Sequence, residues 1–276
     1  MSMAWVTLLT QPEYLVGVRA LQRSLTLSGS RYPLVVMVTE NIAAAARRQL
    51  VADGSQVRDV APLSPNPQLA NRYANARFSE VWSKLRAWQL TEFSRVVFLD
   101  ADMLVTQNMD ELFKLPLAPD ALAACHACRC NPNHIDSYPA DWVPENCFYS
   151  LCRGEDHLEQ PDRVDNYLNS GLLVLKPDEQ VFAQMLAQLA ALDDLSEYRF
   201  PEQDFLNQFY RQRWQPLPWI YNALKTLPDQ HPAIWDRKRA KNLHFILDKP
   251  WQRPPDPQSR YYALDKAWWQ VAEGLS

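Results

Sequence analysis

Short apolar runs alternate with helically spaced apolar residues along the first hundred residues of the chain. The runs over 5–9, 32–39, 57–60 and 96–99 predict strands that are buried on both faces. Residues such as Val18, Leu21 and Leu25 predict helices between them, over 14–25, 42–51 and 80–90. This alternation is typical of α/β proteins, so we expect a Rossmann-like, mixed but mostly parallel sheet flanked by helices.

The second half of the chain has a less regular pattern. Strands are expected over 122–125, 172–175 and 243–247, and helices over 179–192, 202–210 and 261–272. The stretch 127–168 is rich in proline and aromatic residues and has no clear period, and such long loops are often functional lids. No repeat or linker divides the chain, so a single domain over 1–276 is expected.

Composition narrows the classes of partner. The net charge of −4 argues against a nucleic-acid groove or an anionic membrane surface. No apolar stretch approaches the roughly 20 residues that cross a bilayer, and residues 1–10 lack a signal-peptide pattern. We therefore expect a cytoplasmic protein with reduced thiols and no integral membrane span. The oligomeric state stays open.

A pair of carboxylates follows the strand expected over 96–99. Asp100 and Asp102 flank Ala101 at the carboxyl end of this strand, which is where open α/β sheets bind their ligands. Two carboxylates can hold a hard divalent cation, and that cation can hold a diphosphate. An acidic turn with no ligand is the alternative interpretation. Because neither G-x-G-x-x-G nor a Walker loop is present, a nucleotide would need side chains and a metal.

Two segments offer polar groups to the same cleft. Residues 169–171, Asn-Ser-Gly, precede an expected strand and could point amide and hydroxyl groups into a cleft or form a simple turn. Residues 201–204, Pro-Glu-Gln-Asp, open an expected helix. Acids there suit the helix dipole, and they could also stabilise positive charge that develops at a cleft edge.

A histidine and a lysine form the third polar segment. His244 lies in an apolar run, and Lys249 follows it by five residues. An imidazole together with two carboxylates suits Mn²⁺ or a similar cation, and a nearby ammonium group suits phosphate oxygens. A satisfied core histidine is the alternative interpretation.

These segments, taken in order, resemble glycosyltransferase family 8, the relatives of glycogenin and galactinol synthase. The matching segments span nearly the whole chain: 6–10 with Tyr14, 82–85, 98–103, 168–171, 201–207, 217–222 and 244–251. The resemblance implies the GT-A fold, with a nucleotide-binding half over 1–125 and an acceptor and catalytic half over 126–276. It also implies a retaining, metal-dependent enzyme that moves glucose or galactose from a UDP-sugar to an acceptor hydroxyl.

The resemblance implies roles for single residues. The metal ligands, for Mn²⁺ or Mg²⁺, would be Asp100, Asp102 and His244. The UDP-sugar would be bound by Leu8, Thr10, Tyr14, Arg77, Lys84, Ala101, Asn169, Ser170 and Lys249. Gln203 matches the residue beneath the reacting carbon. Glu202 or Asp204 would be the nucleophile if the reaction passed through a covalent intermediate. Lys84 would assist departure of the diphosphate.

Two departures from the family pattern bear on function. The interval from His244 to Lys249 is one residue shorter than in the family, which puts the reach of Lys249 in question. No tyrosine lies between Tyr221 and His244, where glycogenin carries the tyrosine that it glucosylates, so we expect a separate acceptor. A polyol such as inositol or a small saccharide is expected, with Trp142, Trp235 and Trp251 as candidate stacking surfaces.

All five cysteines fall between residues 125 and 152. A zinc site can be drawn from four of them: Cys125, Cys128, Cys147 and Cys152. The alternative is that all of them, Cys130 included, are small buried thiols beneath the long loop. Two other functions stay open: another metal-dependent nucleotide-processing enzyme, such as a nucleotidyltransferase, and a non-catalytic scaffold built on the cysteines.

Overall fold

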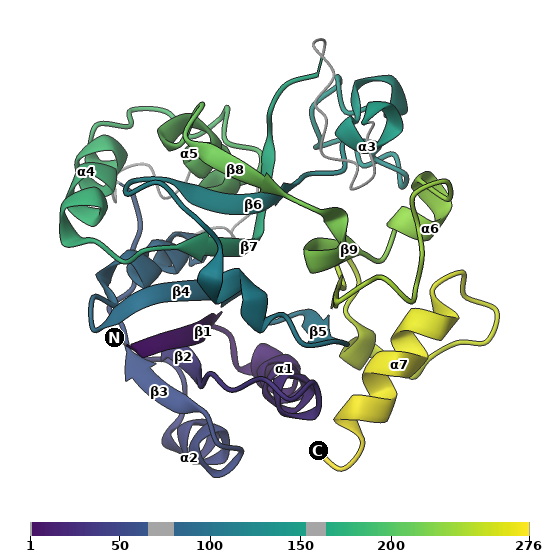
Figure 1. Ribbon diagram of the computed structural model, residues 1–276, viewed down its shortest axis with the longest axis horizontal. Coiled ribbons are helices and arrows are strands. Elements are labelled where there is room, and N and C mark those ends of the chain that lie inside the picture. Colours follow the sequence, from purple (N-terminus) through teal and green to yellow (C-terminus); the bar gives the residue numbers. More distant parts are fainter. Residues whose placement is uncertain (1, 66–79, 153–163, 276) are drawn as a thin grey trace.

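A seven-stranded sheet organises the protein, as a computed structural model shows (Figure 1). The structure describes residues 2–65, 80–152 and 164–275. In spatial order the strands are β3 (Gln56–Asp59), β2 (Leu34–Val38), β1 (Ser2–Leu9), β4 (Phe93–Leu99), β7 (Leu168–Leu175), β6 (Leu122–His126) and β8 (Trp214–Leu217). β7 runs antiparallel to both its neighbours, and the other pairs are parallel. The predicted mixed, mostly parallel sheet is therefore confirmed.

A second, smaller sheet lies beside the first. It contains β5 (Met103–Val105), β10 (Asn242–His244) and β9 (Ala223–Leu224), with β10 in the middle. The helices are α1 (Leu15–Leu27), α2 (Ala44–Ala52), α3 (Phe148–Leu151), α4 (Glu179–Ala190), α5 (Pro201–Phe209), α6 (Leu227–Gln230) and α7 (Tyr262–Ala272). Among the described residues, no helix is both long and apolar enough to cross a membrane.

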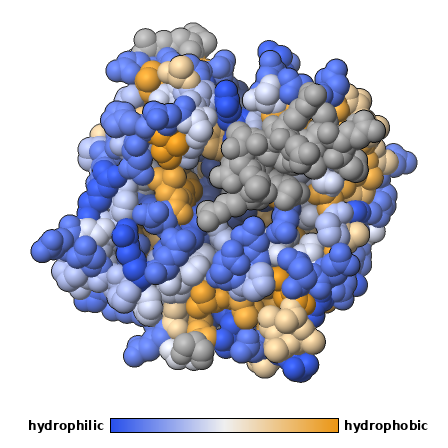
Figure 2. Space-filling view, turned by 180° about the vertical axis from the view of Figure 1, so that it is seen from behind, coloured by the Kyte–Doolittle hydropathy of each residue, from blue (hydrophilic) through white to orange (hydrophobic). Residues whose placement is uncertain are grey.

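Strand β4 is buried on both faces, as its apolar run predicts. Val96 and Phe98 pack into a core beneath α4 and α5, while Val97 and Leu99 pack into a second core with α1. Hydrophilic residues cover most of the face shown in Figure 2, and apolar residues emerge there only in small groups. Because β4 is packed against a core on each face, the central strand is held rigidly, and so is the acidic turn that follows it.

The segment Val81–Gln89 forms a 3₁₀ helix instead of the predicted α-helix. Its buried Trp82, Leu85 and Trp88 recur every third residue, which is the period of a 3₁₀ helix. The segment over 127–168, expected to lack structure, contains the short helix α3 within its described residues. The division into one domain with two functional halves stays a prediction.

Candidate functional site

The site is built around the acidic turn after β4. The Asp100 amide donates a hydrogen bond to the Gly171 carbonyl at 2.9 Å, and the Phe245 amide donates to the Asp102 carbonyl at 2.9 Å. The first bond joins the turn to β7, and the second joins it to the chain just after β10. Both sheets therefore meet at this turn.

Strand direction explains why residues 169–171 reach the turn. Because β7 is antiparallel to β4, with Leu172 opposite Leu99, its first residues lie beside the last residues of β4. Asn169 and Ser170 thus belong to the start of a strand, whereas the sequence placed them before it. Their side chains lie at the sheet edge where α/β sheets bind ligands.

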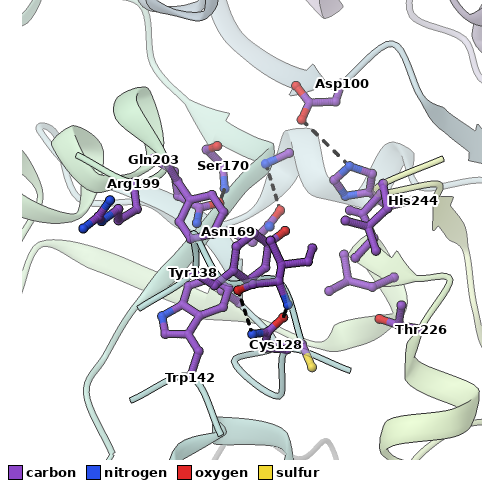
Figure 3. Close-up of a pocket in the computed structure, with 18 of the residues that line it drawn as sticks. Asp100, Cys128, Tyr138, Trp142, Asn169, Ser170, Arg199, Gln203, Thr226 and His244 are labelled. Carbon is purple, nitrogen blue, oxygen red and sulfur yellow. Dashed lines mark hydrogen bonds and ion pairs between the residues drawn. The ribbon is translucent and has the colours of Figure 1, made fainter. Parts of the chain in front are cut away.

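Asp100, Asp102 and His244 converge, as Figure 3 shows for Asp100 and His244. His244 Nε2 lies 3.3 Å from Asp102 Oδ1 and 3.9 Å from Asp100 Oδ2. One ligand atom from each residue lies within 4.8 Å of the other two. β10 is antiparallel to β5 and pairs His244 with Met103, directly after Asp102. Two carboxylate oxygens and one imidazole nitrogen form a donor set that fits Mn²⁺ or Mg²⁺.

A chain of hydrogen bonds holds the imidazole in place. His244 Nδ1 donates to Asn222 Oδ1 at 2.8 Å, and Asn222 Nδ2 donates to Asn169 Oδ1 at 2.7 Å. This assignment leaves the lone pair of Nε2 directed at the carboxylates. Gly171 makes room for the ring, since a Cβ there would lie 2.5 Å from His244 Cε1. The imidazole is therefore fixed in an orientation that suits a metal ligand.

Two lysines neutralise the carboxylates of the acidic turn. Lys84 Nζ lies 2.9 Å from Asp100 Oδ1 and 3.0 Å from Glu202 Oε1, and Lys249 Nζ pairs with Asp102. Lys249 therefore reaches the site although its interval from His244 is one residue shorter than in the family. Within this interval Leu247 adopts a left-handed conformation, with φ of 65°. With a cation bound by the carboxylates, the two ammonium groups at this turn could face phosphate oxygens.

Burial and charge act in opposite directions on the pKa values of these groups. Burial alone would raise the pKa of Asp102, but Lys249 holds that pKa well below its usual range. Burial raises the pKa of Asp100, and Lys84 offsets only part of this. Burial would lower the pKa of Lys84, but Asp100 and Glu202 raise it above its ordinary value. Asp102 and Lys84 are therefore charged at neutral pH.

A cavity of about 370 Å³ lies on the N-terminal side of the turn. Most of the residues predicted to bind the donor nucleotide line this cavity. They are Leu8, Thr10, Tyr14, Lys84, Ala101 and Lys249. Arg77 lies outside the described residues.

A second cavity, of about 450 Å³, lies on the other side and shares Asp100, Asp102, Glu202 and Lys249 with the first. Asn169, Ser170 and Gln203 line this second cavity, with an aromatic wall opposite His244 (Figure 3). In this wall Trp142 stacks on Phe200 at 4.6 Å between ring centroids, and Tyr138 packs edge-on against both.

Only one of the three candidate stacking tryptophans lines these two cavities. Trp142 does so, whereas Trp235 packs on Trp219 and Trp251 packs between Tyr14 and Trp268. Trp235 and Trp251 are therefore corrected to packing residues, because neither ring lines the two cavities.

The three polar residues that open α5 point in different directions. Gln203 Oε1 accepts from the Ser170 amide at 3.1 Å, and Glu202 Oε1 accepts from Lys84 and from Ser170 Oγ. Asp204 lines neither cavity, because its carboxylate accepts hydrogen bonds from Tyr167 and from the Phe200 amide. The structure thus places Gln203 and Glu202 at the site and gives Asp204 a positioning role.

Only two of the four zinc ligands drawn from the sequence, Cys128 and Cys147, meet in the structure. The cluster found in the structure contains Cys128, Cys130, Cys147 and His231. Cys125 instead donates to the Pro218 carbonyl and Cys152 to the Tyr149 carbonyl. Cys125 and Cys152 are therefore wrong as predicted ligands. The spacing rule did not consider the single-residue gap between Cys128 and Cys130 or a histidine about a hundred residues away.

Sequence reasoning missed several residues of the second cavity and its supports. Asn222, which orients His244, and the lining residues Tyr138, Arg199, Phe200 and Thr226 were not predicted. Asn222 belongs to a segment that matches the family, which could have drawn attention to it. The others lie in the loop and in helix flanks that carry no regular pattern.

Comparisons with known proteins agree with this geometry. The family model described as "Glycosyl transferase family 8" matches residues 5–254 of this chain. Galactinol synthase 1 of Solanum lycopersicum is 31% identical over 98% of this chain and 81% of its own length. The crystal structure of the galactosyltransferase LgtC with donor and acceptor sugar analogues superposes with a TM-score of 0.66 at 16% identity, covering 98% of this chain and 95% of that one.

A bifunctional glycosyltransferase, WbbM, superposes with a TM-score of 0.65 at 20% identity, and this chain spans about 50% of its length. Both solved structures share the fold of this chain, which is the GT-A fold predicted from the sequence. The sequence match covers nearly the whole chain, including the acidic turn and His244. The chain belongs to glycosyl transferase family 8.

Proposed function

We propose that the protein is a retaining, metal-dependent hexosyltransferase that moves glucose or galactose from a UDP-sugar to an acceptor hydroxyl. The observation that carries this proposal is the convergence of Asp100, Asp102 and His244 between two cavities that share these carboxylates. One cavity is suited to a nucleotide and the other to an acceptor. Family membership favours this function over a nucleotidyltransferase or a non-catalytic scaffold.

The divalent cation would be held by Asp100, Asp102 and His244 and would supply positive charge to the diphosphate. Lys84 and Lys249 add fixed positive charge on the same side, in a partly buried cleft where each such contact stabilises a departing diphosphate strongly. Leu8, Thr10 and Tyr14 would hold the uridine in the first cavity.

Retention of configuration is proposed to proceed by attack on the same face of the sugar. Gln203 places an amide at the second cavity, where it would stabilise the positively charged sugar. The acceptor proton would pass to the leaving phosphate. Glu202 is the nucleophile of the alternative two-step route, but its carboxylate is held in an ion pair with Lys84. Asp204 has no access to the described cavities.

The acceptor is proposed to be a polyol such as inositol or a small saccharide. Galactinol synthase 1 is named for a galactinol product. The second cavity combines an aromatic wall with polar groups from Asn131, Asn133 and Thr226, and that combination suits a polyhydroxylated ring. The cytoplasmic location expected from the sequence stays a prediction.

A screen for UDP release tests the proposal. UDP-glucose and UDP-galactose are each incubated with Mn²⁺ and with inositol, simple sugars or no acceptor, and UDP and the glycosylated product are measured. We expect one donor to release UDP faster when one acceptor is added, together with a matching product of retained anomeric configuration. Release that no acceptor accelerates, or a product of inverted configuration, would contradict the proposal.

A further inference from the structure

Three cysteines and a histidine meet beneath the loop that forms the aromatic wall. Cys128 and Cys130 follow β6, Cys147 immediately precedes α3, and His231 directly follows α6. Although α3 and α6 are distant in the sequence, Figure 1 shows them beside each other. The rings of Tyr149 and His231 are in contact there. Four potential ligands from three separate segments therefore converge at one point.

The spacing of these atoms is that of a tetrahedral metal site. His231 Nε2 lies 3.3 Å from Cys128 Sγ, 3.3 Å from Cys130 Sγ and 3.4 Å from Cys147 Sγ. Cys128 Sγ and Cys147 Sγ are 3.9 Å apart. A tetrahedral zinc with ordinary bond lengths requires about 3.6 Å between sulfur and nitrogen and about 3.8 Å between two sulfurs.

The surroundings of the cluster also suit thiolate ligands. Cys130, Cys147 and His231 are buried, and the Arg129 amide donates to Cys147 Sγ at 3.4 Å, as backbone amides do to metal-bound thiolates. All four side chains direct their ligand atoms inward, within 4.8 Å of one another. Simple packing of buried thiols gives no reason for an imidazole nitrogen to lie at equal distances from three sulfurs.

We propose that Cys128, Cys130, Cys147 and His231 bind one structural Zn²⁺ that ties the loop after β6 to the segment after α6. Three soft thiolates and one imidazole form a closed tetrahedral set, which favours zinc over the harder cation proposed for the acidic turn. The three thiols lose their protons to solvent when the ion binds. Cys128 and Thr226 also line the second cavity, so the ion would fix the shape of the acceptor side.

Metal analysis of the full-length protein tests the proposal. Wild type and four variants are purified without chelator, exchanged into Mn²⁺ buffer, and analysed for zinc by mass spectrometry. Cys130→Ser and Cys147→Ser remove proposed ligands, while Cys125→Ala and Cys152→Ser change cysteines whose thiols lie outside the cluster. We expect about one zinc per chain in wild type and both controls, and at least a tenfold loss in the two ligand variants.

Cobalt substitution keeps the test decisive if the ligand variants fail to fold. Wild-type protein produced with Co²⁺ is expected to show thiolate-to-cobalt charge-transfer absorption and the visible bands of a tetrahedral site. Wild-type protein with less than a tenth of a zinc per chain would overturn the proposal. So would a cobalt protein without thiolate bands, or a Cys152→Ser variant that loses zinc as fully as Cys147→Ser. None of these readouts depends on glycosyl transfer.

Discussion

At the scale of single residues, the orientation of one imidazole decides whether the site can hold a cation. The sequence supplied all three candidate ligands, because acidic pairs after a buried strand and a histidine in an apolar run are visible as local patterns. It could not supply Asn222, whose amide fixes the tautomer of His244 across the small sheet. Asn169 in turn accepts a hydrogen bond from Asn222 Nδ2, which helps to hold the Asn222 amide in this orientation.

Replacing Asn222 with leucine tests this orientation. Asn222→Leu keeps the branched shape of the side chain but removes the acceptor for His244 Nδ1. We expect the affinity for Mn²⁺ to fall by about 10- to 100-fold, as it does when a partner of a metal-bound histidine is lost. Isothermal titration of Mn²⁺ in the presence of UDP measures the change.

Asn242→Leu is the matched control for that experiment. Asn242 is another buried asparagine of the small sheet, and its amide donates to Tyr221 and Met103 rather than to His244. This variant should lose stability but keep its Mn²⁺ affinity. Equal Mn²⁺ affinity in wild type and Asn222→Leu would show that Asn222 does not orient the ligand.

At the scale of elements, the sequence predicted the regular strands and long helices well and the connections poorly. Runs such as 96–99 predict strands because burial on both faces leaves only apolar residues. The direction of β7 was not predictable, since an apolar run carries no sign of parallel or antiparallel pairing. The short strands β5, β8 and β9 were missed because two to four residues carry no clear period.

The loop after β6 provides Tyr138 and Trp142 of the aromatic wall, and a tryptophan substitution tests the role of this wall. Trp142→Leu removes the ring that stacks on Phe200, while Trp235→Leu removes a ring that packs on Trp219 and lies outside both cavities. We expect Trp142→Leu to raise the KM for the acceptor by about 2- to 10-fold, the usual value of one aromatic contact. The Kd for UDP should stay unchanged.

Steady-state kinetics at saturating donor measure this effect in both variants. Trp235→Leu should leave the KM for the acceptor at the wild-type value. Equal changes in the two variants would mean that Trp142 acts only through the stability of the loop. A change in UDP affinity in Trp142→Leu would likewise contradict the assignment of the wall to the acceptor.

At the scale of the whole molecule, two sheets of different size produce one cleft. The large sheet supplies Asp100 and Asp102 at the end of β4, and the small sheet supplies His244. Neither sheet contains the complete donor set. Lys84 and Lys249, which lie far apart in the chain, balance the acidic pair until a cation and a diphosphate arrive. Metal and donor nucleotide should therefore bind together.

Binding of UDP, measured by calorimetry with and without Mn²⁺, tests this claim most directly. Wild type should bind UDP at least about a hundredfold more weakly without the cation, because a metal contact with a diphosphate is worth several kcal/mol. Asp102→Asn should bind UDP weakly in both conditions, while Asp248→Asn, which changes an exposed carboxylate, should match wild type. Equal UDP affinity in wild type with and without Mn²⁺, or full coupling retained in Asp102→Asn, would contradict the account.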